Sequence, residues 1–315
     1  MTNFTLAIPS KGRLKDQCEA YLGKCGFKLR QKGGDRGYQA TLDGLDGARV
    51  LLLSASEIAR ELVEGGVHAG VTGEDLLHET TDRLDSRVHV ARRLGFGGAD
   101  AVVAVPNAWL DVSSMADLEA AAAQFQARHG RRMRVATKYV NLTRRFFAEK
   151  AVGDYRIVVS AGATEAAPSS GTAELIVDIT STGSTLRANN LKILDDGVIL
   201  ESQAALSASL AANWDEKHLK VLRNLLENMS AKSAGEAHSV LTFGRAPPED
   251  LVAELNLTVL SDRRQALCPQ RTTTQAARAL TDAGYGPIVA ASADFVFGAE
   301  DPGLDVFLRK LQEAS

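Results

Sequence analysis

The sequence is poor in aromatic residues and in cysteine, and both shortages exclude classes of protein. Phe, Trp and Tyr make up only 5% of its 315 residues, too few for the stacking surfaces on which proteins bind single-stranded nucleic acid. The three cysteines, Cys18, Cys25 and Cys268, have neither metal-binding nor CxxC spacing, so we expect buried structural thiols in a reducing compartment. The six histidines form no cluster of the HExxH kind, which argues against a zinc site.

The chain also lacks a strong charge bias and long hydrophobic runs. Its 36 basic and 39 acidic residues give a formal net charge of −3, so no overall positive field favours nucleic acid. The N-terminus has no basic segment followed by a long apolar core, and no apolar run approaches the length of a membrane span. These absences predict a cytoplasmic protein that binds neither membrane nor nucleic acid. The length of 315 residues allows two or three domains.

The most informative stretch runs from residue 162 to residue 192. The apolar, β-branched run at residues 175–179 predicts a buried strand that carries Asp178, and a helix is expected to begin near Leu186. Between them lies a turn of hydroxyl-bearing residues and glycine, namely Thr180, Ser181, Thr182, Gly183, Ser184 and Thr185. A helix N-terminus supplies unpaired N–H groups, glycine lets the backbone come close, and hydroxyls donate to phosphate oxygens.

This hydroxyl-rich turn has no lysine, so it is not a Walker-type loop, and it suits a monophosphate attached to a sugar. The alternative is a turn whose hydroxyls only cap the helix. A second unusual turn favours the binding site, because it flanks the same strand and contains Glu165, Gly171 and Thr172. The carboxylate of Asp178 suits sugar hydroxyls or a metal ion rather than the phosphate.

Polar residues also follow two other predicted strands. Lys11 and Arg13 follow the first strand of the chain. Glu74 and Asp75 follow a later one, at the beginning of a helix. Binding groups gather where strands end in α/β folds. A surface Lys-Arg pair is common, however, and two acids in a first helical turn also interact favourably with the helix dipole, so both alternatives stay open.

The order of elements predicts two α/β lobes joined by two crossing segments. The chain leaves the first lobe at a glycine hinge, residues 95–98, and returns in extended runs beyond Asn190. The expected parts are lobe I at residues 1–95 plus 195–230, lobe II at residues 96–194, and a C-terminal α+β domain at residues 236–315. Asn213, with Glu216 three residues later, is expected to cap a helix, and the polar segment 230–236 is expected to be a linker. Ligands of such a clam-shell bind in the cleft.

Taken together, these motifs resemble the ATP phosphoribosyltransferase family, whose members catalyse the first step of histidine biosynthesis. The matching pieces are KGRL at 11–14, GVTGEDLL at 70–77, ATKYVNLTRRFF at 136–147, GATEAAPSSGTAELIVDITSTGSTLRANNLK at 162–192 and DDGVILESQA at 195–204. The resemblance implies an α/β fold whose catalytic core is two-lobed and similar to type II periplasmic binding proteins. It also implies ATP and phosphoribosyl pyrophosphate as substrates and Mg²⁺ as cofactor. The reaction would join N1 of ATP to C1 of the phosphoribosyl group and release pyrophosphate.

The resemblance also implies roles by position. The loop at residues 180–185 would hold the 5′-phosphate, and Asp178 and Glu165 would face the ribose hydroxyls or the metal-bound pyrophosphate. Lys11, Arg13 and the turn of Gly73, Glu74 and Asp75 would lie on the ATP side. N1 carries no proton, so its attack needs no general base, and the work left is to stabilise charge on the pyrophosphate. The basic candidates for this work are Lys11, Arg13, Lys138, Arg144 and Arg145. For Arg144 and Arg145, solvated charges on a helix are an equal alternative.

Two regions differ from the pattern of the family. Where members of the family often have an Arg before the second helix, this chain has Ser54, Ala55 and Ser56, which puts an ATP contact there in doubt. Long members end in a ferredoxin-like domain that binds L-histidine as feedback inhibitor, whereas short members use a separate synthetase-like regulatory partner. Residues 236–315 have the long-form length, but their elements do not clearly follow the order βαββαβ. We expect a homo-oligomer and leave the regulatory partner open.

A function of another class is a non-catalytic small-molecule binding module, or a catalytically dead paralogue, because clam-shell folds often serve as receptors. The missing export signal argues against a receptor. Hydroxyl-rich turns suited to phosphate favour the enzyme.

Overall fold

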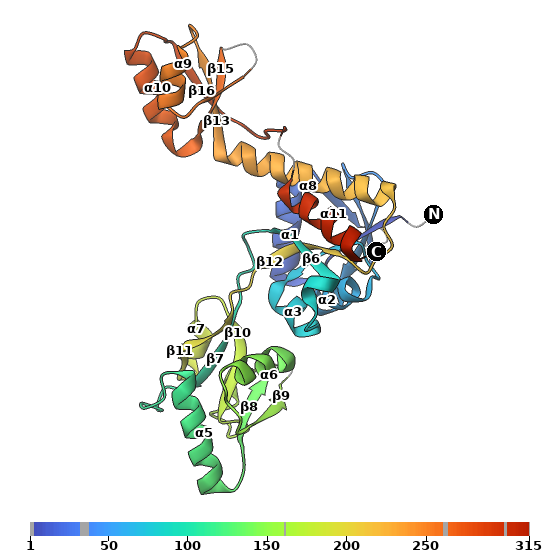
Figure 1. The fold of residues 1–315 in the computed structure, drawn as a ribbon, viewed down its shortest axis with the longest axis vertical. Coiled ribbons are helices and arrows are strands. Elements are labelled where there is room, and N and C mark those ends of the chain that lie inside the picture. The colour runs from blue at the N-terminus through green and yellow to red at the C-terminus, as the bar shows by residue number, and fades with distance from the viewer. Residues whose placement is uncertain (1–2, 32–37, 161, 261–263, 299–300, 315) are drawn as a thin grey trace.

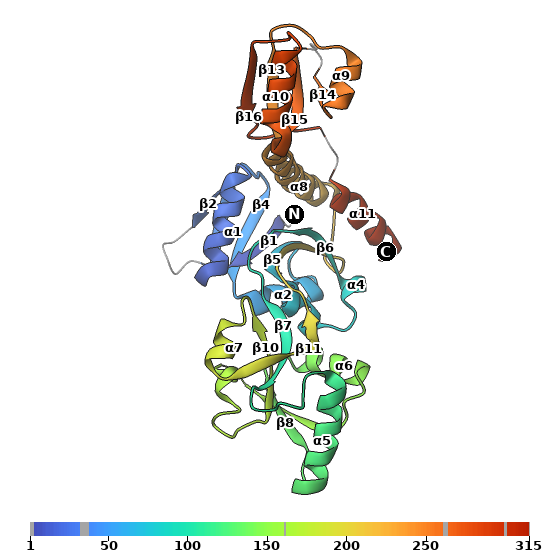
Figure 2. The ribbon, with the colours of Figure 1, turned by 90° about the vertical axis from the view of Figure 1, so that its left-hand side faces the viewer.

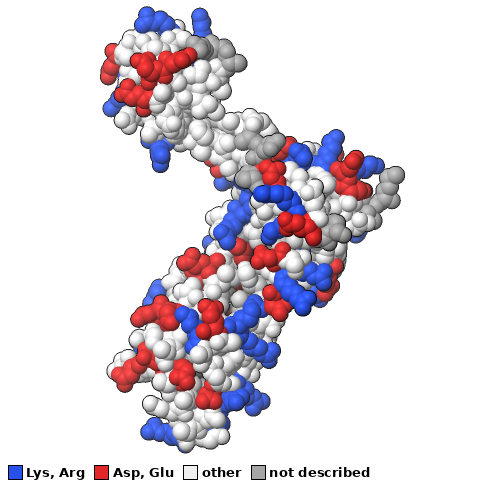
Figure 3. All heavy atoms as spheres, in the orientation of Figure 1, with Lys and Arg blue, Asp and Glu red and all other residues white. Residues whose placement is uncertain are grey.

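Figure 1 shows a computed structural model in which three parts of the chain follow one another along a long axis. The structure describes residues 3–31, 38–160, 162–260, 264–298 and 301–314. Lobe I lies in the middle of this view, lobe II below it and the C-terminal part above it. Acidic and basic side chains are mixed over the face that Figure 3 presents, in keeping with the small net charge. Within the described ranges, no helix is both long enough and apolar enough to cross a membrane.

Lobe I is built on a seven-stranded sheet with the order β2-β3-β4-β1-β5-β12-β6. Its strands are β1 (Phe4–Pro9), β2 (Lys28–Gln31), β3 (Gln39–Asp43), β4 (Ala48–Leu53), β5 (Ala69–Gly73), β6 (Val88–Arg93) and β12 (Ala204–Ser209). At its centre β1 pairs in parallel with β4 and β5, and β12 is antiparallel to β5 and β6. The central strands β1 and β12 are buried over nearly their whole length, so both consist mainly of apolar residues with a few small polar ones.

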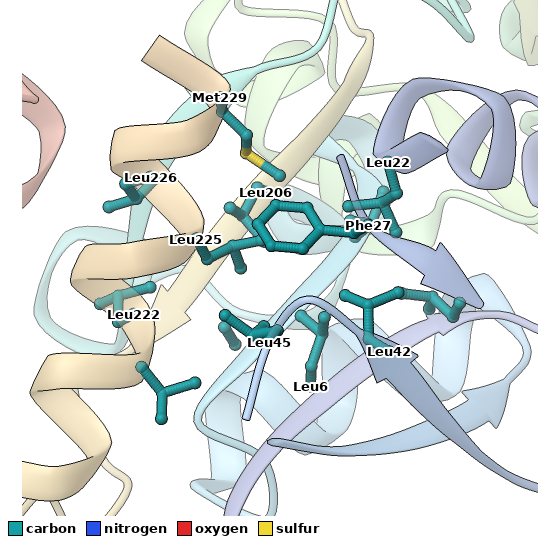
Figure 4. Packing of buried hydrophobic residues seen from close by; sticks show 14 of the residues in the cluster. Leu6, Leu22, Phe27, Leu42, Leu45, Leu206, Leu222, Leu225, Leu226 and Met229 are labelled. Carbon is teal, nitrogen blue, oxygen red and sulfur yellow. The ribbon is translucent and has the colours of Figure 1, made fainter. Parts of the chain in front are cut away.

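Helices cover both faces of this sheet. They are α1 (Gly12–Lys24), α2 (Ala55–Glu64), α3 (Glu74–Thr80), α4 (Leu84–Arg87), α8 (Glu216–Ala237) and α11 (Pro302–Ala314). One hydrophobic cluster joins the sheet to α1, α8 and α11, and a second joins it to α2 and α3. Figure 4 shows Leu222, Leu225 and Met229 of α8 packed toward Phe27 and Leu6. Cys18, Cys25 and Cys268 are buried free thiols, as predicted.

Lobe II is built on a five-stranded sheet with the order β11-β7-β10-β8-β9. Its elements are β7 (Asp100–Pro106), α5 (Met115–His129), β8 (Met133–Thr137), α6 (Val140–Glu149), β9 (Tyr155–Val159), η1 (Thr164–Ala166), β10 (Leu175–Thr180), α7 (Ser184–Ala188) and β11 (Leu191–Leu200). The buried strand β10 is parallel to β8 but antiparallel to β7, with Thr180 opposite Asp100. The end of β10 therefore lies beside the beginning of β7, where the chain arrives from lobe I.

Two extended segments connect the lobes, as the sequence predicts (Figure 2). They are bonded to each other, because the amide of Ala99 donates to the carbonyl of Ser202 at 2.9 Å and the amide of Ala204 donates to that of Phe96 at 3.0 Å. The return crossing follows Leu200, later than the expected residue 195, because β11 stays paired with β7 up to that residue. The two-lobed α/β architecture itself is confirmed.

The polar segment at residues 230–236 is not a linker. It forms the last part of α8, which runs unbroken to Ala237, and Ala231 and Gly235 are buried there. A Cβ on Gly235 would lie 2.6 Å from the carbonyl oxygen of Asp294, so the helix packs closely against the returning chain. The expected cap was also wrong by two residues: Asp215, not Asn213, accepts the cap hydrogen bond, from the amide of His218.

The C-terminal part has a four-stranded antiparallel sheet with the order β14-β15-β13-β16. Its elements are β13 (His238–Phe243), α9 (Glu249–Glu254), β14 (Thr258–Val259), β15 (Gln265–Pro269), η2 (Gln270–Thr272), α10 (Thr273–Asp282) and β16 (Ile288–Ser292). This is the βαββαβ order of a ferredoxin-like domain. The sequence concealed it because β15 is short and only two of its residues, Ala266 and Cys268, are fully buried.

The last helix, α11, returns to lobe I instead of staying with the ferredoxin-like sheet (Figure 1). Its Leu304 and Phe307 are buried in the lobe I core. Asp301, only 2% exposed, precedes the helix and accepts hydrogen bonds from Arg92 of β6 and Ser230 of α8. We therefore propose that α11 be counted with lobe I.

Asp301→Ala is expected to lower the free energy of unfolding by about 3 kcal/mol, because the Arg92 guanidinium would lose its buried carboxylate partner. The matched control is Asp43→Ala, which removes an exposed ion pair with Arg30 and should cost less than about 1 kcal/mol. Urea denaturation followed by circular dichroism measures both losses. Equal losses would mean that the Asp301 contacts do not hold α11 on lobe I.

Candidate functional site

A cavity of about 760 Å³ lies between the two lobes, against the segments that connect them. Lobe I, the crossing and lobe II all contribute to its wall, which includes Arg13, Ala55, Ser56, Gly73, Asp75, Gly95, Phe96, Gly97, Gly98, Asp100, Lys138, Tyr139, Ile179 and Ser181. The cavity thus brings together four polar residues that the sequence predicted as site residues: Arg13, Asp75, Lys138 and Ser181.

Asp75 is a buried carboxylate in this wall. It is the second residue of α3, which directly follows β5, and it is 5% exposed. Its Oδ2 accepts from the Tyr139 hydroxyl at 2.7 Å, and its Oδ1 accepts from the Ser202 hydroxyl at 3.0 Å. Burial and the neighbouring carboxylate raise the pKa of Tyr139, so the phenol remains a hydrogen-bond donor. A carboxylate of lobe I is thereby joined to lobe II and to the return crossing.

Glu74 has a different environment, although it is adjacent to Asp75. Its buried carboxylate accepts hydrogen bonds from Arg93 of β6, with Nε at 2.9 Å from Oε1. Both oxygens are engaged by the same guanidinium, in the bidentate manner typical of Arg–carboxylate pairs. The interaction raises the pKa of Arg93. The pair of Glu74 and Arg93 therefore fixes the end of β6, just before the chain crosses to lobe II.

In lobe II, Lys138 of the cavity wall and the carboxylate of Glu165 both influence the carboxyl group of Asp178. Burial raises the pKa of the Asp178 carboxyl, nearby Glu165 raises it further, and the amide of Ile179 and the ammonium of Lys138 act in the opposite direction. Lys138 extends from the end of β8, and its Nζ lies 4.9 Å from the centre of the Tyr139 ring. Two carboxylates and one cation so arranged can bind hydroxyls, a metal ion or the oxygens of a pyrophosphate.

The loop at residues 180–185 follows β10 and begins at the cavity. The Ser181 hydroxyl donates to the carbonyl of Gly98 in the crossing at 2.6 Å, which ties the loop to the hinge. Gly183 has φ 68°, in the left-handed region that favours glycine, and its amide donates to Thr180 Oγ1 at 2.8 Å. Some of the hydroxyls therefore shape the loop itself. The amide of Ser184 is engaged in the same way, by Thr182 Oγ1 at 3.4 Å.

Arg187 of α7 is hydrogen-bonded to this loop. Its Nη2 donates to the carbonyl of Thr182 at 3.0 Å, and its backbone amide donates to the carbonyl of Gly183. A second hollow of about 510 Å³ lies on this side, and Gly183, Arg187 and Lys192 are in its wall. Thr185, in the first turn of α7, is exposed. The loop is therefore a preformed turn to which the guanidinium of Arg187 is bonded.

Several predicted residues lie outside the wall of the interlobe cavity. They are Lys11, Glu74, Glu165, Gly171, Thr172, Asp178, Thr180, Thr182, Gly183, Ser184 and Thr185. Gly171 and Thr172 belong to a turn of lobe II, where the Gly171 carbonyl accepts from Arg134 and Thr172 Oγ1 donates to the carbonyl of Ala167. Arg145, a candidate for pyrophosphate, instead donates to the carbonyl of His78.

Three residues of this region were not predicted from the sequence: Tyr139, Ser202 and Arg187. Tyr139 directly follows Lys138 at the end of β8, so the rule that strand ends carry function should have included it. Ser202 gave no such signal, because its role comes from a contact with Asp75, which lies 127 residues away. Arg187 contacts its neighbours in the chain, Thr182 and Gly183, and no pattern distinguished it from a solvated charge on a helix. Ala55 and Ser56, where a ligand contact was in doubt, do line the cavity.

Among the described residues, no group of three or more His, Cys, Asp or Glu side chains is arranged to hold a metal ion. Mg²⁺ is commonly bound by one or two carboxylates together with substrate phosphates. The neighbouring Asp178 and Glu165 fit that second arrangement.

Comparison with known proteins gives consistent matches. The model of the HisG family, described as ATP phosphoribosyltransferase, matches residues 54–231. An ATP phosphoribosyltransferase of Caulobacter vibrioides is 51% identical, with 99% of this chain and 98% of the relative covered. One of Rhodopseudomonas palustris is 47% identical, with 98% and 99% covered. A chain of the ATP phosphoribosyl transferase (HisG:HisZ) complex from Thermotoga maritima superposes with a TM-score of 0.55 and 25% identity, covering 72% of this chain and 95% of that one.

Proposed function

The chain belongs to the ATP phosphoribosyltransferase family, and we propose that the cavity between its lobes is the active site. The protein is an enzyme of the first step of histidine biosynthesis, and its substrates are ATP and phosphoribosyl pyrophosphate. The observation that supports the site is the convergence of Arg13, Asp75, Lys138 and Ser181, from both lobes, on one cavity. A cytoplasmic location is part of the proposal, because the relatives are biosynthetic enzymes.

Lobe II would bind the phosphoribosyl group. The preformed turn at residues 180–185 would receive the 5′-phosphate through its hydroxyl donors, with the guanidinium of Arg187 bonded to the turn. The amides of Gly183 and Ser184 would not contribute, because they donate to Thr180 and Thr182 of the same turn. Asp178 and Glu165 would face the ribose hydroxyls or the metal that accompanies the pyrophosphate. Gly171 and Thr172 would support this side from the adjoining turn. Mg²⁺ supplies charge neutralisation for the leaving group when it is bound with the substrate.

Lobe I would bind ATP. Arg13, at the first turn of α1, and the turn from Gly73 to Asp75 face the cavity, and Ser56 adds a hydroxyl. Lys11, the N-cap residue of α1, is exposed two residues earlier, where it would reach phosphates beyond the cavity wall. Glu74 would contribute indirectly, since its carboxylate holds Arg93.

The chemistry asked of these side chains is alignment and charge stabilisation. N1 of adenine has a lone pair and no proton, so no base is required to attack C1. The protein has to bring N1 to C1 from the opposite lobe and to stabilise the negative charge on the departing pyrophosphate. Arg13 and Lys138 line the cavity from opposite lobes and suit the second task, with Lys11 nearby.

Turnover is the direct test of this proposal. The purified chain, mixed with ATP, phosphoribosyl pyrophosphate and Mg²⁺, is expected to form N1-substituted ATP, which ultraviolet absorbance detects. Chelation of the metal with EDTA should stop the reaction, because the charge on the pyrophosphate would no longer be neutralised. No turnover, alone or with a regulatory partner subunit, would favour the non-catalytic binding module.

Gly183→Ala is expected to raise the KM for phosphoribosyl pyrophosphate about tenfold and to leave the KM for ATP nearly unchanged. The left-handed φ of 68° costs an L-residue roughly 1–2 kcal/mol. The added Cβ would also lie 2.9 Å from Nη1 of Arg187 and push that side chain from the loop. Gly153→Ala is the control in the same lobe, because a Cβ there meets nothing within 4 Å. An unchanged KM for phosphoribosyl pyrophosphate in Gly183→Ala would show that the loop does not bind this substrate.

The ferredoxin-like domain, β13 to β16, would bind L-histidine as feedback inhibitor, as in the long members of the family. Its βαββαβ order and the nearly complete coverage of the Caulobacter relative support this proposal. The chain would then work as a homo-oligomer, and a separate partner like that in the Thermotoga complex would be an alternative. L-histidine is expected to raise the melting temperature and to reduce turnover, while L-leucine does neither. If L-histidine has neither effect, the ferredoxin-like domain does not bind it.

A further inference from the structure

The lobes have a third connection besides the two crossing segments. The carboxylate of Glu79, in α3 of lobe I, accepts hydrogen bonds from the backbone amides of Asn141 at 3.0 Å and Leu142 at 2.9 Å. These amides are in the first turn of α6 in lobe II, and the N-cap residue of that helix, Tyr139, does not cap it with its own side chain. A helix of one lobe is thus capped by an acid of the other.

Further contacts along α3 strengthen this connection. The side-chain amide of Asn141 donates to the backbone carbonyl of Glu79 at 2.9 Å, and Arg145 donates to the backbone carbonyl of His78. Tyr139 and Asp75 are bonded at the other end of α3. Between these ends, Leu76 packs against the hydrophobic cores of both lobes. The seven-residue helix α3 is therefore fixed to lobe II along its length.

We propose that Glu79 is a positioning residue: its cap on α6 sets the angle between the lobes at which N1 of ATP meets C1 of the phosphoribosyl group. The inference rests on the proposed placement of the two substrates on opposite lobes. Two extended crossing segments alone form a hinge about which lobes can rotate. The cap lies away from that hinge and restrains the rotation. A misplacement of about 1 Å between reacting atoms can cost a hundredfold in rate.

A purely local role, the stabilisation of α6, is the competing explanation. The chain offers a matched control for it in Asp117, whose carboxylate accepts from the amides of Ser113 at 3.1 Å and Ser114 at 2.9 Å. Asp117 caps α5 with Ser114, and every one of these residues belongs to lobe II. Loss of this cap removes the same kind of interaction without touching the interface between the lobes.

Steady-state kinetics of Glu79→Ala, Glu79→Gln and Asp117→Ala test the proposal. Glu79→Ala is expected to lower kcat about tenfold or more, with less than about threefold change in the KM for either substrate. Glu79→Gln keeps one acceptor oxygen and the shape of the side chain, so it should recover part of kcat. Asp117→Ala should lower the melting temperature but leave kcat within about twofold. An equal fall of kcat in Asp117→Ala, or none in Glu79→Ala, would overturn the proposal.

A distance measurement tests the same idea without turnover. Spin labels on cysteines introduced at exposed Arg60 of α2 and Glu119 of α5 report the separation of the lobes, and the three native cysteines are buried. Double electron–electron resonance should give a broader distribution in Glu79→Ala than in the parent or in Asp117→Ala. An unchanged distribution would overturn the proposal whatever the kinetics. Absence of turnover in the parent would instead overturn the proposed function, and the distances would still decide on Glu79.

Discussion

The cavity between the lobes depends on one buried carboxylate that three separate segments of the chain share. Asp75 of lobe I holds the phenol of Tyr139 from lobe II and the hydroxyl of Ser202 from the return crossing. A carboxylate withdrawn from water is tolerated only when its oxygens have hydrogen-bond partners. The three residues therefore have to stay together in the folded protein. Their meeting point determines where the walls of the cavity lie, because the wall contains residues from each segment.

Strand order explains how residues far apart in sequence reach this place. In lobe I, the parallel strands β1 and β5 end at the same edge of the sheet, which brings Arg13 and Asp75 to the cavity. In lobe II, β10 runs antiparallel to β7, so its end lies beside the entry of the chain. The loop after β10 can therefore bond to the crossing through Ser181 and Gly98. Both lobes place their polar turns at the crossing for topological reasons.

Much of this arrangement was predictable from local patterns, and the remainder required the fold. Apolar runs and strand ends located the two lobes and the residues Arg13, Asp75 and Ser181, and the family resemblance added Lys138. The polar composition of residues 230–236 was misleading, because tertiary packing of Ala231 and Gly235 keeps that segment helical. Ser202 and Glu79 could not be found this way. Their partners lie 127 and 62 or more residues away, and no local pattern encodes such pairs.

The junction between α8 and the ferredoxin-like sheet has a mechanical consequence. The helix ends at Ala237 and β13 begins at His238, so no flexible residue separates them. The same helix presses Leu222 and Leu225 onto the core of lobe I, and the returning α11 packs there as well. Because no tether lies at this junction, we expect a rotation of the C-terminal sheet to be transmitted through α8 to lobe I. A signal received by the C-terminal domain would then act as a rotation of the sheet that contributes the lobe I wall of the cavity.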